Sequence, residues 1–177
     1  MEGLIQYTIP IKGIGNGIHE FEFQADHSFF QAFEHSSILE GAVTVKLIFE
    51  KRPELYVLNF ALDGTVKTEC DRCLVDIHLP ISNEHQLLVK LGEEESEEND
   101  PDVIYIHPET PKLQIAQFIY EYIHLSVPMI KVYDCQMEEE PPCNMDMLKY
   151  LEATEKEVTD QDNGNNPIWD ALKNLDL

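Results

Sequence analysis

Alternating apolar and polar residues fill the first half of the chain and predict a β-sheet there. Residues 4–11 and 18–25 are apolar-rich segments, and the glycines of "GIGNG" between them predict a hairpin or loop. In "AVTVKLIFEK" and in the segment after the turn "KRPE", every second residue is apolar. We expect these two segments to pair as antiparallel neighbours, each with one apolar face: Val43, Val45, Leu47 and Phe49 on the first, Tyr56, Leu58, Phe60 and Leu62 on the second.

Two cysteines lie close together between two further extended segments. After Asp63-Gly64, which is expected to interrupt the strand, Val66 and Thr68 lead into "ECDRC", and residues 73–81 alternate again. The pattern places Cys70 and Cys73 at the tip of a hairpin. Before these strands, "DHSFFQAFEHS" predicts a short helix with Asp26 or Ser28 as N-cap and with phenylalanines 29, 30 and 33 turned inward.

The second half of the chain mixes helices with acidic loops. The run 92–102 is too charged to pack and predicts a solvated loop, and "VIYIH" after it predicts a short strand. A helix is expected over 111–125, with Thr110 as cap and Pro111 in the first turn, and it must end before Pro128. After a second acidic loop, Asn144 is expected to cap another helix. The last element, "NPIWDALKNL", has the features of an amphipathic helix.

These elements predict an α+β protein with an antiparallel, possibly barrel-like sheet, a few packed helices and a helical C-terminal part. Residues 1–135 are expected to form the sheet domain, with its helix 111–125 and acidic loop 92–102. Residues 136–177 are expected to add an acidic loop and helices that pack on this domain or extend from it. No run of about 18 apolar residues occurs in the chain, and the start, "MEGLIQYTIP", lacks a signal-peptide pattern. We therefore expect a cytoplasmic protein with no membrane partner.

The charge is strongly negative and uneven along the chain. There are 34 acidic against 12 basic residues, a net charge of −22, with 13 acids and 7 bases in residues 1–90 and 21 and 5 in residues 91–177. Nucleic acids are bound by clustered lysines and arginines, so this composition favours a basic protein as the partner. Simple solubility is the alternative reason for the charge. No small-molecule substrate is evident.

The four cysteines (Cys70, Cys73, Cys135 and Cys143) are expected to be thiols or metal ligands, because the cytosol keeps thiols reduced. The C-x-x-C pair could supply half of a zinc site, which Cys135 and Cys143 could complete, or the pair could be free thiols at a hairpin tip. Redox chemistry is less favoured, since such pairs stand at the start of a helix. No nucleophile elbow, Walker loop or HExxH motif occurs, "GIGNG" lacks the G-x-G-x-x-G spacing, and no catalytic residue is predicted.

Several of these segments, taken in order, resemble one family. "VKTECDRCLVDI", an acidic insertion, "LQIAQFIYEYIHLSVPMIKV", Cys143 and "NPIWDALKNL" together resemble the YceD family, the large ribosomal RNA subunit accumulation proteins, which occur in bacteria and in plant plastids. The resemblance covers residues 40–177. By position, the motif residues are Cys70, Arg72, Cys73, Leu74, Pro128, Cys143, Pro167 and Trp169.

The resemblance implies a non-enzymatic factor needed for accumulation of large-subunit ribosomal RNA and for ribosome assembly. Some relatives end in a ribbon with further C-x-x-C pairs, whereas this chain keeps only Cys135 and Cys143. A three-cysteine site completed by His107, Cys135 or an acid is a further alternative. RNA contact would have to use the modest basic cluster Lys46, Lys51, Arg52 and Lys67, with Arg72 nearby. The competing hypothesis is a basic ribosomal protein held by the acidic second half. A zinc-binding domain unrelated to RNA and, last, a metal-dependent hydrolase are the remaining alternatives.

Overall fold

The computed structural model describes residues 4–34, 36–38, 40–92, 102–133, 142–151 and 153. The chain divides into two compact units. The first comprises residues 1–68 and 76–131, and the second comprises residues 69–75 and 132–177. None of the helices in the described ranges is long and apolar enough to cross a membrane.

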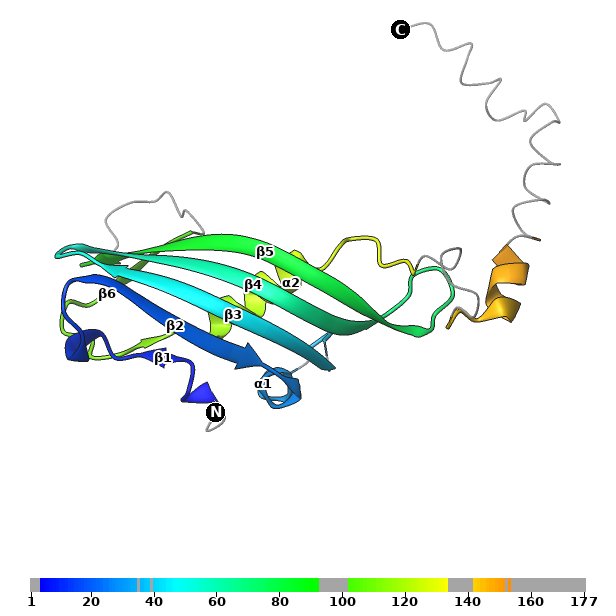
Figure 1. Cartoon of the computed structure of the whole chain (residues 1–177), viewed down its shortest axis with the longest axis horizontal. Helices are drawn as coiled ribbons and strands as arrows, with labels where there is room; N and C mark the ends of the chain where they lie inside the picture. The colour runs from blue at the N-terminus through cyan, green and yellow to red at the C-terminus, as the bar shows by residue number, and fades with distance from the viewer. Residues whose placement is uncertain are drawn as a thin grey trace, which may run out of the picture. The chain divides into compact units, whose positions relative to one another are not determined.

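A five-stranded sheet forms the body of the first unit (Figure 1). Its strands, in spatial order, are β2 (Gly17–Ala25), β3 (Glu40–Lys51), β4 (Leu55–Glu69), β5 (Asp76–Leu91) and β6 (Val103–Ile106). β2, β3 and β4 pair antiparallel, and the six-residue connection after β4 is too short for a parallel crossover, so β4 and β5 form a hairpin. The α+β class and the antiparallel pairing of β3 with β4 are therefore confirmed. The sheet is open, with β2 and β6 as its edges, so the possible barrel is wrong.

Two details of the sheet differ from the sequence prediction. β6 pairs parallel to β5, from Leu88 opposite Val103 to Leu91 opposite Ile106, although the sheet was expected to be antiparallel. β4 continues through Asp63 and Gly64 as one 15-residue strand. Gly64 does not end the strand; it allows β3 and β4 to approach closely. It lies opposite Val43 in β3, and a Cβ at Gly64 would come within 2.7 Å of the Val43 Cα.

Of the two alternatives for "GIGNG", the hairpin is wrong and the loop is confirmed, since the two apolar segments do not pair with each other. β1 (Thr8–Ile9) pairs instead with β7 (Leu113–Gln114), in a separate two-stranded sheet. A short 3-10 helix, η2 (Ile11–Gly13), follows β1. The carbonyls of Ile11 and Ile14 accept hydrogen bonds from the Lys51 ammonium at the end of β3. The first apolar segment therefore has a strand partner far along the chain, which the local sequence pattern does not indicate.

Two of the three helices described below begin at the capping residue that the sequence predicts. α1 (His27–Gln31) begins after Asp26, whose carboxylate accepts the Phe29 N–H at 3.2 Å, as predicted. Residues 145–151 are helical, and the Asn144 side chain accepts the N–H of Asp146. The third helix, α2 (Ala116–Ser126), begins five residues later than expected, because residues 113–114 belong to β7.

Three predictions lie outside the described residues. They are the body of the acidic loop at 93–101, the second acidic loop at 134–141, and the final helix in "NPIWDALKNL".

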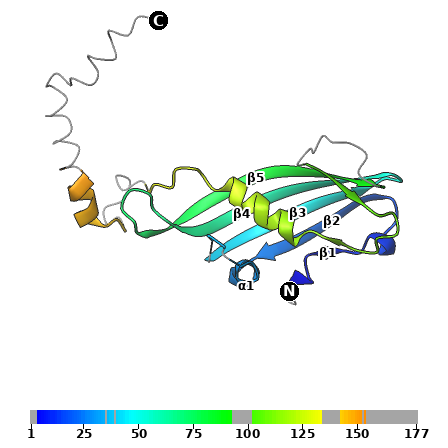
Figure 2. The ribbon, with the colours of Figure 1, turned by 180° about the vertical axis from the view of Figure 1, so that it is seen from behind.

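The apolar faces of the strands form the core with α2. Figure 2 shows α2 lying across one face of the sheet. The Tyr122 ring on α2 meets Phe60 of β4 edge-to-face, with 5.2 Å between ring centroids. The alternating residues predicted to face the core are all buried: Val43, Val45, Leu47, Phe49, Tyr56, Leu58, Phe60 and Leu62. We call the face that packs on α2 the inner face and the opposite one the outer face.

Candidate functional site

The outer face of the sheet is an open surface of the first unit. No helix in the described ranges covers it, and Figure 1 shows the four long strands passing in front of α2. Because the strands alternate, every residue that faces outward is the sequence neighbour of a core residue. The alternation that predicts the core residues therefore also predicts which residues form this face.

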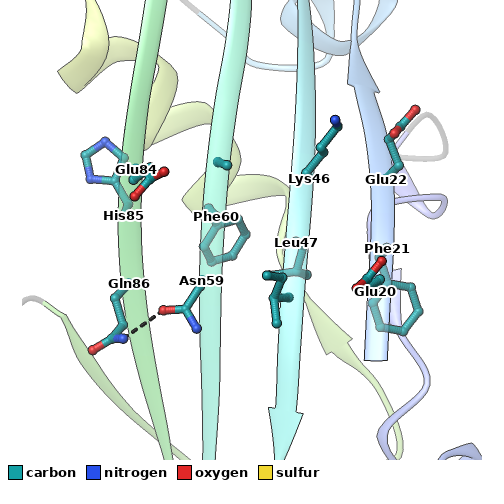
Figure 3. Close-up of a pocket in the computed structure, with 12 residues that line it drawn as sticks. Glu20, Phe21, Glu22, Lys46, Leu47, Asn59, Phe60, Glu84, His85 and Gln86 are labelled. Carbon is teal, nitrogen blue, oxygen red and sulfur yellow. Dashed lines mark hydrogen bonds between the residues drawn. The ribbon is translucent and has the colours of Figure 1, made fainter. Parts of the chain in front are cut away.

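A shallow hollow of about 890 Å³ lies in the middle of this face. Figure 3 shows the outward side chains that line it, from β2, β3, β4 and β5 in turn. They are Glu20, Glu22, Lys46, Ile48, Asn59, Ala61, Glu84 and Gln86. We call this set the trough. It continues toward Thr44 and Asp63, which line a smaller hollow beside it.

Acidic residues dominate the trough. Glu20, Glu22 and Glu84 are exposed around one lysine, Lys46, which lies opposite Glu22 in the β2–β3 ladder. Within the described ranges, Lys46 forms no ion pair. Gln86 donates to the Asn59 side chain across β4 and β5 at 2.7 Å. The surface thus offers carboxylates and amides, a set of groups suited to binding cations.

The basic residues predicted to contact RNA do not gather into one patch. Along the β3–β4 ladder, Lys67 lies opposite Glu40, whereas Lys51 and Arg52 lie at the other end of β3. The twelve residues from Glu40 to Lys51 span about 35 Å at the rise of a strand. Arg72 lies in the β4–β5 tip and belongs to the second unit.

Most of these cations are also engaged within the fold. Lys51 donates to the carbonyls of Ile11 and Ile14 at 2.8 Å each. Arg52 forms a bidentate pair with Glu50, which raises the pKa of the guanidinium and lowers the pKa of the carboxyl. Lys67 lies between Asp76 (3.1 Å) and Glu40 (3.4 Å), and these hydrogen bonds raise its pKa. Only Lys46 of this set faces the trough.

His85 on β5 lies beneath the trough, on the inner face. Its ring stacks on Tyr122 at 4.4 Å and 3°, and its buried Nε2 has no hydrogen-bond partner among the described residues. Burial lowers the pKa of His85, although the charge of Asp102 opposes this shift. Burial also raises the pKa of Tyr122 to about 12. Both groups are therefore neutral at pH 7.

We expect this histidine to make folding sensitive to acid. In the unfolded chain a histidine titrates near pH 6.5, whereas in the fold it binds its proton at a lower pH. The unfolded state therefore binds more protons in this window, and stability is lost as the pH falls from about 6.5 toward the folded value. His85→Phe keeps the stack and should flatten the loss of thermal stability between pH 7 and pH 5. An equal loss in this variant, or a normal His85 titration by NMR, contradicts the assignment.

The β4–β5 tip in the second unit holds the cysteine pair. Cys70 and Cys73 are free thiols with no exposed surface. The Cys70 N–H donates to the Val75 carbonyl, and the Leu74 N–H donates to the Cys70 carbonyl, both at 2.9 Å. Leu74 has a φ of 60° and an exposed side chain, so the turn holds a leucine in the left-handed region. The hairpin-tip prediction is confirmed.

The tip stabilises a thiolate at Cys70. Burial raises the pKa of this thiol, but hydrogen bonds from the backbone of Tyr133, Cys73 and Arg72 and from the Cys73 side chain outweigh it and lower the pKa to about 7. Thiolates are the form that binds metals.

The zinc site nonetheless stays a prediction. No group of three or more potential ligands gathers within the described ranges. Cys143 is buried in the same unit and disulfide-bonded, so the expectation that it is a thiol is wrong. Cys135 lies outside the described residues. His107, in the first unit, accepts the Glu109 N–H on its own Nδ1.

Three motif residues remain: Pro128, Pro167 and Trp169. Pro128 is exposed and follows the end of α2 at Ser126, as its sequence position predicted. Pro167 and Trp169 lie outside the described residues. The prediction missed Glu20, Glu22 and Glu84, although the alternation that identified the core also marks them as outward neighbours of core residues.

Comparison with known proteins finds one family. The family model described as "Large ribosomal RNA subunit accumulation protein YceD" matches residues 58–176. This range begins in β4 and includes the cysteine tip, β5, β6 and α2. No curated protein and no solved structure matches the chain.

Proposed function

The chain belongs to the YceD family of large ribosomal RNA subunit accumulation proteins, and from this premise we propose that it is a non-enzymatic cytoplasmic factor that binds a basic ribosomal protein. In this proposal the factor supports accumulation of large-subunit ribosomal RNA by delivering or protecting a protein that the RNA needs. Binding sites for a basic partner and for a phosphate backbone require opposite charges. The charge of the open surface therefore supports one partner over the other.

The acidic trough is the observation that carries the proposal. Glu20, Glu22 and Glu84 lie exposed on the uncovered face of the sheet. Ribosomal proteins are rich in lysine and arginine because they bind RNA, and such side chains complement this surface. An RNA-binding surface needs cations that are free to release counterions, whereas Arg52 and Lys67 are paired with carboxylates.

A charge-reversal experiment tests the proposal. Tagged protein is mixed with proteins extracted from large ribosomal subunits, and separately with the ribosomal RNA, and the bound material is identified. We expect a basic ribosomal protein to bind. The triple variant Glu20→Lys, Glu22→Lys, Glu84→Lys should weaken that binding at least tenfold, since each reversal replaces attraction by repulsion.

The matched control changes the same net charge elsewhere. Glu34→Lys, Glu54→Lys and Glu121→Lys alter three exposed residues outside the trough. This control should retain binding within about threefold. If both triples weaken binding equally, only net charge matters and the trough is not the site. If RNA binds instead, with a steep salt dependence that Lys46→Glu reduces, the protein-partner proposal is wrong.

A further inference from the structure

β2 is an edge strand whose outward-pointing backbone groups can be identified from the register. Arg52 N–H donates to the Leu55 carbonyl, so in the β3–β4 ladder the even-numbered residues of β3 form the hydrogen-bonded pairs. The odd-numbered residues of β3 therefore bond to β2, where they lie opposite odd-numbered partners such as Phe21 and Phe23. The even-numbered residues of β2 point their N–H and C=O groups away from the sheet.

Most of this edge has no partner in the described part of the chain. At Gln24 the edge is closed, because the Tyr7 hydroxyl donates to the Gln24 carbonyl at 2.6 Å. No hydrogen bond from any described residue reaches the backbone of Ile18, Glu20 or Glu22. A stretch of five residues, about 17 Å long, thus presents an unpaired ladder.

The inward side chains of this edge are only partly covered: the Phe23 ring lies 5.9 Å from that of Tyr7, and the Phe21 ring lies 6.4 Å from that of Phe49. Phe21 and Phe23 face inward with the core, yet both stay half-exposed because β2 has no strand on its far side. Their rings stack on each other at 6.3 Å. Ile18 keeps 68% of its surface exposed. An added strand would cover the two phenylalanines on the inner face and meet Ile18, Glu20 and Glu22 on the outer face.

We propose that the free edge of β2 binds an extended cationic segment of the partner as a sixth, antiparallel strand of the sheet. The segment would carry lysine or arginine at alternate positions facing Glu20 and Glu22, with apolar residues between them facing Phe21 and Phe23. This inference rests on the proposed function and specifies how the basic partner is held. A second copy of the chain fits the edge poorly, because antiparallel pairing centred on Phe21 places Glu20 and Glu22 of one copy opposite those of the other.

The test uses the full chain and a defined probe. The probe is a seven-residue peptide that alternates lysine and valine and is blocked at both ends. Two further peptides are methylated on the backbone nitrogens, one at the lysines and one at the valines. Residues opposite each other in a hydrogen-bonded pair share a face, so the lysine N–H groups must point to β2. Methylation at the lysines should weaken binding at least tenfold, and methylation at the valines should change it less than about threefold.

Variants of the protein test whether the backbone of β2 takes part in the same ladder. Glu22→Pro removes the charge and the edge N–H, whereas Glu22→Gln removes only the charge. We expect the proline variant to bind the probe about tenfold more weakly than the glutamine variant. Val103→Pro is the control, because Asp102 and Ile106 bond to β5 and the Val103 N–H therefore points away from it. This control should bind like the parent. On the parent protein, the amides of Ile18, Glu20 and Glu22 should gain protection from hydrogen exchange when the probe binds.

The outcomes separate this inference from the proposed function. If the two methylated peptides bind alike, strand addition at β2 is wrong, and this comparison needs no variant that folds. If the parent chain is a dimer that Glu22→Pro dissociates, the occupant of the edge is a second copy and the inference is also wrong. In either case, capture of a basic ribosomal protein that depends on the trough leaves the proposed function intact. If no basic protein is captured at all, the proposed function fails.

Discussion

Gly64→Ala is expected to destabilise the protein by about 3 kcal/mol or more, enough to leave a large unfolded fraction in a domain of ordinary stability. A methyl group at this position would overlap the Ala42 carbonyl oxygen and come within 2.7 Å of the Val43 Cα. Both atoms are backbone atoms of β3, which is hydrogen-bonded on both sides to β2 and β4. They cannot move aside without breaking a ladder in the middle of the sheet.

The measurement is the free energy of unfolding in denaturant, compared with a second glycine in the same unit. A Cβ at Gly15 would have no atom within 4 Å, so Gly15→Ala should change stability by less than about 0.5 kcal/mol. Destabilisation of less than about 1 kcal/mol by Gly64→Ala would show that the close approach of β3 and β4 is not as the structure has it.

Gly64 also shows what sequence patterns convey and what they omit. The alternation of Val43 to Phe49 and of Tyr56 to Leu62 predicts two strands and their buried faces, because period and burial are local properties of a half-buried strand. A glycine within such a pattern is equally consistent with a turn or with a close approach of two backbones. Which of the two applies depends on the neighbouring strand, and the sequence does not state its register.

Partner choice between strands is less predictable for the same reason. The segment containing Thr8 and Ile9 has the composition of a strand, and the glycines after it suggest a hairpin. Its partner is Leu113–Gln114, more than a hundred residues away. That pairing also shortens α2, since residues assigned to its first turn become β7. Caps that act within one turn, such as Asp26 and Asn144, were predicted correctly.

The candidate site has no motif that a sequence pattern could reveal. Cysteines and clustered lysines attract notice in a sequence, whereas single glutamates spaced along strands do not. Glu20 and Glu22 lie on β2, and Glu84 lies on β5, three strands away in the sheet. Their proximity to one trough arises from strand order, which the sequence alone did not supply.

Lys51→Met is expected to cost about 2–4 kcal/mol, although lysine-to-methionine changes at surfaces are usually harmless. The Lys51 ammonium donates to the carbonyls of Ile11 and Ile14 at 2.8 Å each. Methionine keeps most of the apolar stem beside Tyr56 but leaves both carbonyls without this donor. The segment that leads from β1 to β2 would then lose its attachment to the end of β3.

Lys46→Met is the matched control, because Lys46 lies on the same strand, is exposed and forms no ion pair with any described residue. Its unfolding free energy should stay within about 0.5 kcal/mol of the parent. Equal stability of the two variants would contradict the role of Lys51 in joining η2 to β3. The comparison also bears on RNA: loss of RNA binding in a Lys51 variant would report a disturbed fold. Lys46, which can be changed without that penalty, is therefore the residue that tests direct RNA contact.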